Sequence, residues 1–133
     1  MTDVTYFERL ERSECLRLLA GHEVGRVAWW TDEGPTILPV NYHLVGEDLV
    51  FHTHPTSPLA RLVVPGQVAF QVDDIDVAAA IGWSVLVRGT SGPSDDERSS
   101  SFLPDPPGLG VAIRIHTVEG RVLSGIVKGE RDE

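Results

Sequence analysis

GWSVLVRG, residues 82–89, and LPVNYH, residues 38–43, are the two stretches that decide the fold class of this chain. Both are rich in β-branched, aliphatic and aromatic residues, which predicts β-strands. Each also carries polar or aromatic side chains, such as Asn41 and Trp83, where a strand buried in a core would keep aliphatic ones. Strands of this composition are typical of a ligand site, so the two stretches also point to where the function lies.

Strand-like segments continue on both sides of these stretches. The sequence predicts strands at 24–31, 36–45, 49–54, 68–72, 83–90 (with a start as early as 78–81) and 111–117, which 118–127 extends or follows. Turns are expected at 32–35 and 46–48, an acidic loop at 73–76, and a loop rich in Pro and Gly at 103–110. Six or so antiparallel strands of this kind predict an all-β barrel, because closing the sheet removes its exposed edges.

Short helices are expected beside the strands. One is predicted at 13–21, with Ser13 as its N-cap and Gly21 at its end. A second is predicted at 58–64, where Ser57 or Thr56 can cap a helix that begins with proline, and a third near 95–102. Pro39 interrupts a strand, and since proline cannot donate to a ladder it predicts a sheet edge, a bulge or a kink that faces a ligand.

Length and composition indicate a single soluble domain over residues 1–133, with an ordered core at 12–127 and frayed tails. The formal net charge of −9 argues against a nucleic-acid partner or an anionic membrane, because phosphate contacts need clustered cations. The polar N-terminus contains no signal peptide, and no apolar run is long enough to span a membrane, so we expect a cytoplasmic protein. The single cysteine, Cys15, excludes an intrachain disulfide and is expected to be buried.

An ordered series of short motifs carries a family resemblance over residues 13–91. The series is GRVA at 25–28, Pro35, LPVNY at 38–42, LVFHT at 49–53, VAFQVD at 68–73 and GWSVLVRG at 82–89. In order and spacing it resembles the flavin-binding split-barrel superfamily, that is, the pyridoxamine 5'-phosphate oxidase-like proteins and their nitroimidazole-reductase-like branch. The resemblance implies a six-stranded antiparallel split β-barrel, a homodimer that holds FMN between its subunits, and an oxidoreductase that transfers hydride or electrons to a small-molecule substrate.

The resemblance also implies which residues hold the cofactor. Pro39, Val40 and Asn41 would run along the isoalloxazine ring. The ribityl phosphate would be approached by His52, Thr53, His54 and Ser57. Trp83 and Ser84 would close the site. The substrate would stack on the exposed face of the flavin, near Trp83 and the loop at 103–110.

The phosphate loop departs from the family pattern. Relatives commonly have a lysine or arginine just after the serine, whereas this chain continues Ser57-Pro58-Leu59. Phosphate binding would then depend on helix N-terminal amides, on hydroxyls such as those of Thr53, Thr56 and Ser57, on protonated His52 or His54, and on a nearby Arg61, Arg26 or Arg88. A deazaflavin and haem are the alternatives to FMN as the ligand.

Two further functions stay open at this point. His52 and His54 stand at i and i+2, on one face of a strand, and could chelate a metal, with His43 as a third ligand if the hairpin pairs suitably. The chain contains no convincing general acid or base, which favours a protein that stores flavin or senses a small ligand without turnover. His22, His116 and the acids at 73–76 are expected to be structural or solvent-facing.

The pair Trp29-Trp30 supports a dimer independently of the resemblance. Neighbouring residues of a strand point to opposite faces, so one indole ring must lie inside the barrel and the other outside. An exposed indole favours a covering partner, and a second subunit would provide the cover.

Overall fold

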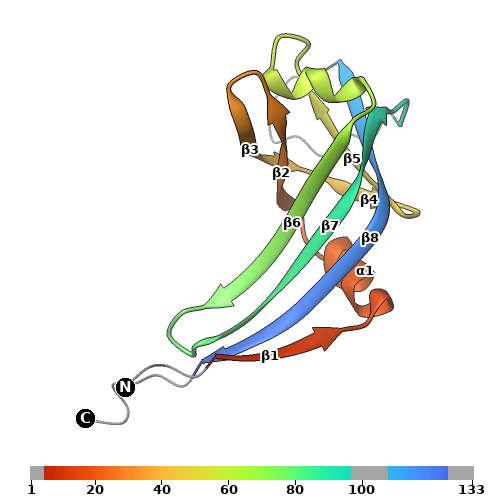
Figure 1. The fold of residues 1–133 in the computed structure, drawn as a ribbon. Coiled ribbons are helices and arrows are strands. Elements are labelled where there is room, and N and C mark those ends of the chain that lie inside the picture. Colours follow the sequence, from red (N-terminus) through yellow and green to blue (C-terminus); the bar gives the residue numbers. More distant parts are fainter. Residues whose placement is uncertain (1–4, 97–107, 126–133) are drawn as a thin grey trace.

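An antiparallel sheet, curled into a half-barrel, forms the body of the part of the chain that the computed structural model describes, residues 5–96 and 108–125 (Figure 1). Within that part the sheet has eight strands, in the order β3-β2-β6-β7-β8-β5-β4, with β1 added along β8. The elements are β1 (Thr5–Leu10), α1 (Arg12–Ala20), β2 (Val24–Thr31), β3 (Gly34–Asn41), β4 (His43–Val45), β5 (Asp48–Thr53), η1 (Pro58–Val63), β6 (Gln67–Asp76), β7 (Ile81–Pro93) and β8 (Leu109–Gly125). The predicted all-β class with short helices is confirmed.

Three long strands connect the two ends of the molecule. In Figure 1, β6, β7 and β8 run from the curled end, where β2 to β5 and η1 lie, into an extended arm along which β1 pairs with β8. β6 and β7 form a hairpin whose register extends from Gln67 opposite Thr90 to Asp76 opposite Ile81. Every strand pair in the described sheet is antiparallel, and short turns connect the consecutive pairs β2–β3, β4–β5 and β6–β7.

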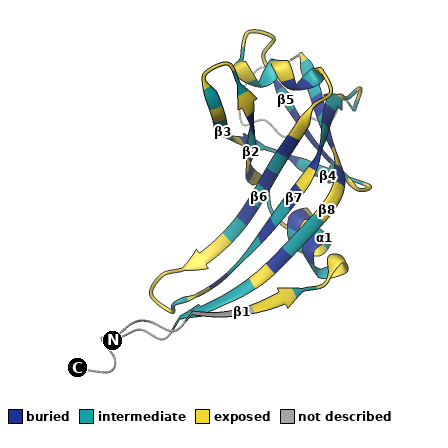
Figure 2. Ribbon diagram, viewed as in Figure 1, coloured by how far each residue is buried: buried dark blue, intermediate teal, exposed yellow. Residues whose placement is uncertain are grey.

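The core fills the inside of the curl (Figure 2). Along β2 the even positions face outward and the odd positions inward, so Val27 and Trp29 are buried. Tyr42 is the largest fully buried side chain; its hydroxyl donates to the Leu19 carbonyl at 2.6 Å, and its ring meets that of Phe70 edge-on at 5.0 Å. Burial raises the pKa of Tyr42 well above its usual range, so the phenol stays neutral and holds α1 to the sheet.

The helix α1 packs against β8 at Gly120. A Cβ at this position would stand 2.5 Å from the Cys15 sulfur, so the close approach of helix and strand requires glycine. Cys15 is buried as expected, and burial raises the pKa of its thiol. Gly21 ends the helix as predicted, but Ser13 is not its cap, because the helix begins one residue earlier and its N-cap Glu11 makes no side-chain capping bond.

Several strand boundaries differ from the expectations. β1 was not predicted, and the acidic residues 73–76 continue β6 where a loop was expected. The predicted strand 36–45 is divided at Tyr42 into β3 and β4, while Pro39 lies on β3 at the end of the sheet order, which confirms the expected edge. Ser57 caps η1 by accepting a bond from the Leu59 amide, although this turn is a 3₁₀ helix. The helix near 95–102, the loop at 103–110 and the charged tail fall mainly outside the described residues.

No helix in the ranges 5–96 and 108–125 has the length and apolar character that crossing a membrane requires.

Candidate functional site

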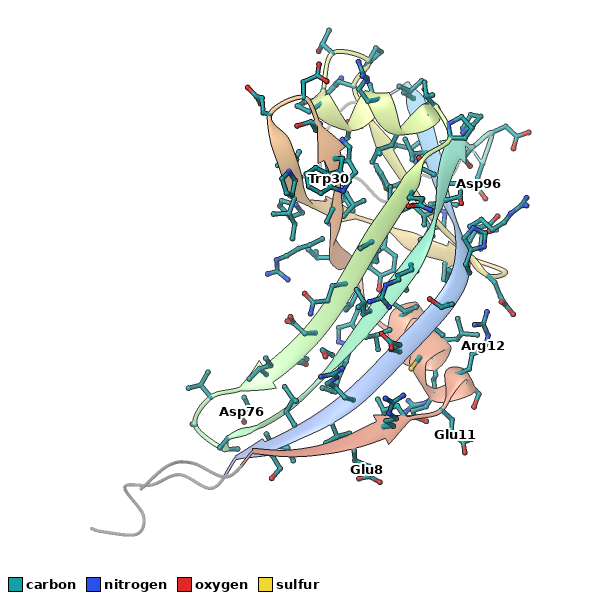
Figure 3. The ribbon with its side chains drawn as sticks, in the orientation of Figure 1. Glu8, Glu11, Arg12, Trp30, Asp76 and Asp96 are labelled. Carbon is teal, nitrogen blue, oxygen red and sulfur yellow. The ribbon has the colours of Figure 1, made fainter. Side chains whose placement is uncertain are left out.

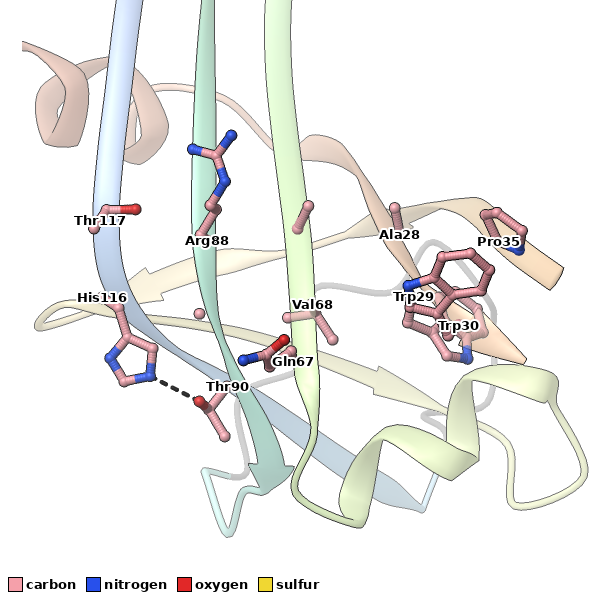
Figure 4. Close-up of a pocket in the computed structure, with 12 residues that line it drawn as sticks. Ala28, Trp29, Trp30, Pro35, Gln67, Val68, Arg88, Thr90, His116 and Thr117 are labelled. Carbon is pink, nitrogen blue, oxygen red and sulfur yellow. Dashed lines mark hydrogen bonds between the residues drawn. The ribbon is translucent and has the colours of Figure 1, made fainter. Parts of the chain in front are cut away.

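A groove lies on the outer face of the sheet, across β2, β6, β7 and β8 (Figure 4). It consists of a first hollow of about 560 Å³ on this face and an adjoining one of about 880 Å³ between the β2–β3 hairpin and η1, where inward-facing residues such as Leu38 and Leu62 line it. The two hollows share Trp29, Trp30, Gln67 and Val68. The first hollow extends toward Arg88 on β7, and the second extends toward Arg61 on η1. Volumes of this order suit a ligand the size of a cofactor.

Small residues make the floor of the groove. Ala28 on β2 is directly opposite Ala69 on β6, and both side chains point outward. Gly89 on β7 continues the floor, and a Cβ there would stand 2.2 Å from the carbonyl oxygen of Arg114. The glycine is therefore required where β7 meets an irregularity of β8. The residue pairs Arg88–Thr117 and Gly89–Ile115 leave His116 as the extra residue of a β-bulge.

One wall of the groove is aromatic. Trp30 is 77% exposed, and its strand neighbour Trp29 is buried, so the indoles divide between the two faces as the sequence predicted. Pro35, directly opposite Trp30 on β3, lies beside the ring (Figure 4). Figure 3 shows Trp30 on the β2–β3 side of the sheet, away from α1 and the arm. This wall therefore presents an apolar surface, the Trp30 indole and the Pro35 ring, beside the floor of small residues.

The opposite wall is polar and its groups are already bonded. The Arg88 guanidinium donates to Glu119 at 2.9 Å, and His116 Nε2 lies 2.7 Å from the Thr90 hydroxyl (Figure 4). The bond from Arg88 lowers the pKa of Glu119 and so favours the charged form of this carboxylate. His116 is exposed, as expected, but the bulge turns it toward the groove.

The second hollow ends at η1. Arg61 lines it together with hydroxyl-bearing residues, of which Thr31 and Thr36 are bonded to each other at 3.0 Å. Ser91, also on its lining, donates to the Val64 carbonyl at 3.2 Å. Asp32 and Glu33 lie at the same end and reduce its positive charge.

The structure brings few of the predicted site residues together. Within the described part of the chain, none of the nine residues that the resemblance implies lines the groove, whereas two of the arginines considered for the phosphate, Arg61 and Arg88, do. Ser57 is the N-cap of η1, the helix that carries Arg61, but its hydroxyl already accepts a bond from the Leu59 amide. Pro39 and Ser84 lie on the outer face farther along the sheet, opposite Arg26 and Arg121 respectively. Asn41 is half-buried at the end of β3, and Val40 belongs to the core.

The remaining predicted residues lie elsewhere. Trp83 packs edge-on against His22, with 4.8 Å between ring centroids, and His22 Nδ1 donates to the Leu18 carbonyl as a structural histidine would. Thr53 is buried, and His54 is exposed on the loop after β5. The substrate position expected near the loop at 103–110 falls mainly outside the described residues.

The histidines do not form a metal centre with their neighbours. His52 Nε2 donates to the carbonyl oxygen of Asp96 at 2.8 Å, which leaves its buried Nδ1 without a hydrogen-bond partner. His43 Nε2 lies 3.7 Å from the Asp96 carboxylate. Across residues 5–96 and 108–125, no group of three His, Cys, Asp or Glu side chains is placed to hold a metal ion.

Sequence reasoning missed the floor of the groove. Ala28, Ala69 and Gln67 carry no chemical signal of their own, and they become a site only because β2 pairs with β6. Trp30 and Arg88 were singled out, but for separate reasons. The signal that could have joined them is a small, outward-facing residue on each of β2 and β6, beside an outward indole.

Comparison with known proteins gives concordant matches. A family model described as pyridoxamine 5'-phosphate oxidase matches residues 11–103. An uncharacterized protein of Mycobacterium tuberculosis is 33% identical over 99 residues, which cover 70% of this chain and 65% of that relative. This chain therefore spans less than two thirds of the relative's length.

Solved structures agree with these matches. The structure of the FAD binding protein from Mycobacterium smegmatis superposes with a TM-score of 0.73 and 27% identity, and covers 88% of this chain and 98% of its own. The FAD and heme binding protein from Mycobacterium smegmatis shares the fold, with a TM-score of 0.70, at 19% identity, with 92% of this chain and 77% of that one covered.

Proposed function

This chain belongs to the pyridoxamine 5'-phosphate oxidase family, and we propose that it is a flavin-binding oxidoreductase that holds its flavin in the groove on the outer face of the sheet. The observation that carries the proposal is the combination of an exposed Trp30 with a floor of Ala28 and Ala69. Such a surface accepts a flat aromatic ring, because the small residues leave room and the indole offers a face to stack against.

The residues of the groove fit a flavin. The ring system would lie over Ala28 and Ala69, and the ribityl phosphate would reach Arg61 at the end of the second hollow. Arg61 thereby supplies a cation that the phosphate loop lacks at Pro58 and Leu59. A bound flavin supplies hydride or electron transfer, and the protein supplies orientation and electrostatics. In this role Trp30 orients the ring and the walls of the groove exclude water from one of its faces.

A second copy of the chain would complete the site. The outer face carries Trp30 at 77%, Ile37 at 58% and Val24 at 47% exposure, on adjoining strands of one sheet. Exposed apolar patches of this kind usually mark an interface. We therefore propose a homodimer whose facing sheets enclose two flavins, with the substrate, a small molecule, entering between the subunits.

FMN is the flavin that we propose, because one cation at Arg61 matches one phosphate. FAD is the second candidate, since the 27%-identical neighbour from Mycobacterium smegmatis is an FAD binding protein. A deazaflavin or haem would also present a flat ring to the floor, and a neighbour with the same fold binds haem as well as FAD. Visible absorption of the reconstituted protein distinguishes these ligands, since oxidised flavins, deazaflavins and haem have different spectra.

A protein that stores flavin without turnover is the alternative function. It is favoured by the polar wall, where Arg88 is bonded to Glu119 and His116 to Thr90, which leaves these groups engaged with each other. The test is steady-state oxidation of a reduced nicotinamide by the flavin-loaded protein with an artificial acceptor. Turnover many times greater than the protein concentration supports the oxidoreductase. A single reduction of bound flavin, or none, contradicts it and supports storage.

A further inference from the structure

Gln67 lines both hollows of the groove, at the place where they adjoin. It is the first residue of β6, it is exposed, and it lies on the same outward face of the strand as Ala69 of the floor. Side chains at i and i+2 of a strand are roughly 7 Å apart. The long side chain of Gln67 therefore reaches the edge of a flat ring that rests over Ala69.

Gln67 lies between the aromatic wall and the polar wall of the groove (Figure 4). It is directly opposite Thr90, which belongs to the polar wall on β7. On its other side, the register that sets Ala28 opposite Ala69 places Trp30 level with Gln67 when it is continued by two residues. A ring that stacks against the indole over the small residues thus has the carboxamide of Gln67 at its rim.

The carboxamide of Gln67 is not engaged with the rest of the protein. The other polar groups around it are bonded, since His116 Nε2 lies 2.7 Å from the Thr90 hydroxyl and Ser91 donates to the Val64 carbonyl. Within residues 5–96 and 108–125, the side chain of Gln67 makes no hydrogen bond. A carboxamide carries two N–H donors and one oxygen acceptor. Gln67 therefore brings a donor and an acceptor, side by side, to a floor that is otherwise apolar.

We propose that Gln67 is the residue that selects the ring: it pairs with an imide edge, the sequence C=O, N–H, C=O that flavins and deazaflavins share and that haem lacks. The Gln67 N–H donates to a ring carbonyl while its oxygen accepts from the ring N–H, in the two parallel bonds by which glutamine also reads adenine. Arginine at this position would offer donors alone, and glutamate acceptors alone. The inference rests on the proposed function and deepens it, because it names the chemical class of ring that the groove accepts.

FMN and its N3-methyl derivative are the probes, and the readout is the dissociation constant from fluorescence quenching. N3-methylation removes the donor of the imide edge and leaves the ring and the phosphate unchanged. We expect the wild type to bind N3-methyl-FMN about tenfold more weakly than FMN. Gln67→Leu should bind FMN about tenfold more weakly than the wild type, and should bind both probes within about twofold of each other. Gln67→Glu, which keeps the size but loses the N–H donor, should weaken FMN binding at least as much.

Gln71→Leu is the matched control. Gln71 has the same spacing from Ala69 along the same face of β6, but on the far side from Trp30, and it lines neither hollow. This variant should keep the wild-type affinity for FMN and the wild-type preference for FMN over N3-methyl-FMN. Loss of that preference in Gln71→Leu, with Gln67→Leu unaffected, overturns the assignment.

The outcomes separate this inference from the proposed function. Equal affinity of the wild type for the two probes overturns the role of Gln67 even if its variants fail to fold, while the binding of FMN itself still supports a flavin protein. FMN binding to a Gln67→Glu variant as tight as to the wild type also overturns it. Absence of FMN binding to the wild type contradicts the proposed function, and the inference falls with it. A urea midpoint equal to that of the wild type confirms that each variant is folded.

Discussion

Filling the floor of the groove should weaken flavin binding without unfolding the protein. Ala69 lies between Ala28 and Arg88 in the sheet register, and its side chain points outward. Leucine at this position adds three carbon atoms where the ring system would rest. Overpacking by a few methylene groups costs about 1–3 kcal/mol, and since each 1.4 kcal/mol is a factor of ten, Ala69→Leu should weaken binding roughly 5- to 150-fold. The assay is quenching of flavin fluorescence during titration with protein.

The control is a leucine on the same strand and face but outside the groove. Gln71 is the next outward residue of β6, opposite Arg26 and Leu86, and it does not line either hollow. Gln71→Leu should bind flavin within about twofold of the wild type, and both variants should unfold within about 0.5 kcal/mol of it. Equal flavin affinity in the two leucine variants would refute the placement of the ring on this floor.

Three further predictions concern the framework of the site. Tyr42→Phe leaves the buried Leu19 carbonyl without the phenol donor and should lower the free energy of unfolding by about 1–3 kcal/mol; an unchanged urea midpoint would contradict it. Gly89→Ala places a Cβ against the Arg114 carbonyl and should cost about 2 kcal/mol or more in the same measurement, whereas Gly92→Ala, which meets open space, should cost far less. The pKa of Glu119 is below its ordinary 4.5 in the folded state, so the stabilisation from its pairing with Arg88 is present above that value and is lost as pH falls through the lowered pKa. A carboxyl NMR titration should show the pKa of Glu119 rise in Arg88→Ala; no change would mean that the pairing has no such effect.

The fold was predictable where one face of a strand is buried. β2 has the predicted bounds, Val24–Thr31, and burial alternates along it, with the odd positions facing the core. β1 was missed, since Glu8 and Arg9 interrupt its pattern and it pairs with β8 alone. Asp73 and Asp76 lie in the arm, where β6 continues because β7 pairs with it and not because a core attracts its side chains. Pairing of this kind is a tertiary effect that composition does not reveal.

The site was less predictable than the fold. Side chains with distinctive chemistry, such as Trp83 and His52, proved to be engaged with His22 and the Asp96 carbonyl. The groove instead depends on Ala28 and Ala69, whose contribution is the space they leave. A sequence records which residues are small, but their adjacency exists only once β2 and β6 pair. Whether the nine residues implied by the family resemblance, or Arg61, contact a cofactor stays a prediction.

The central claim is that two copies of this chain enclose a flavin between the outer faces of their sheets. Sedimentation velocity of the flavin-loaded protein tests it most directly, when protein absorption and flavin absorption are monitored in the same run. We predict that the flavin sediments with a species of twice the chain mass, at one flavin per chain, and that Trp30→Asp shifts the protein toward the monomer and releases the flavin. A monomer that sediments without colour in the presence of excess FMN and FAD would contradict the account.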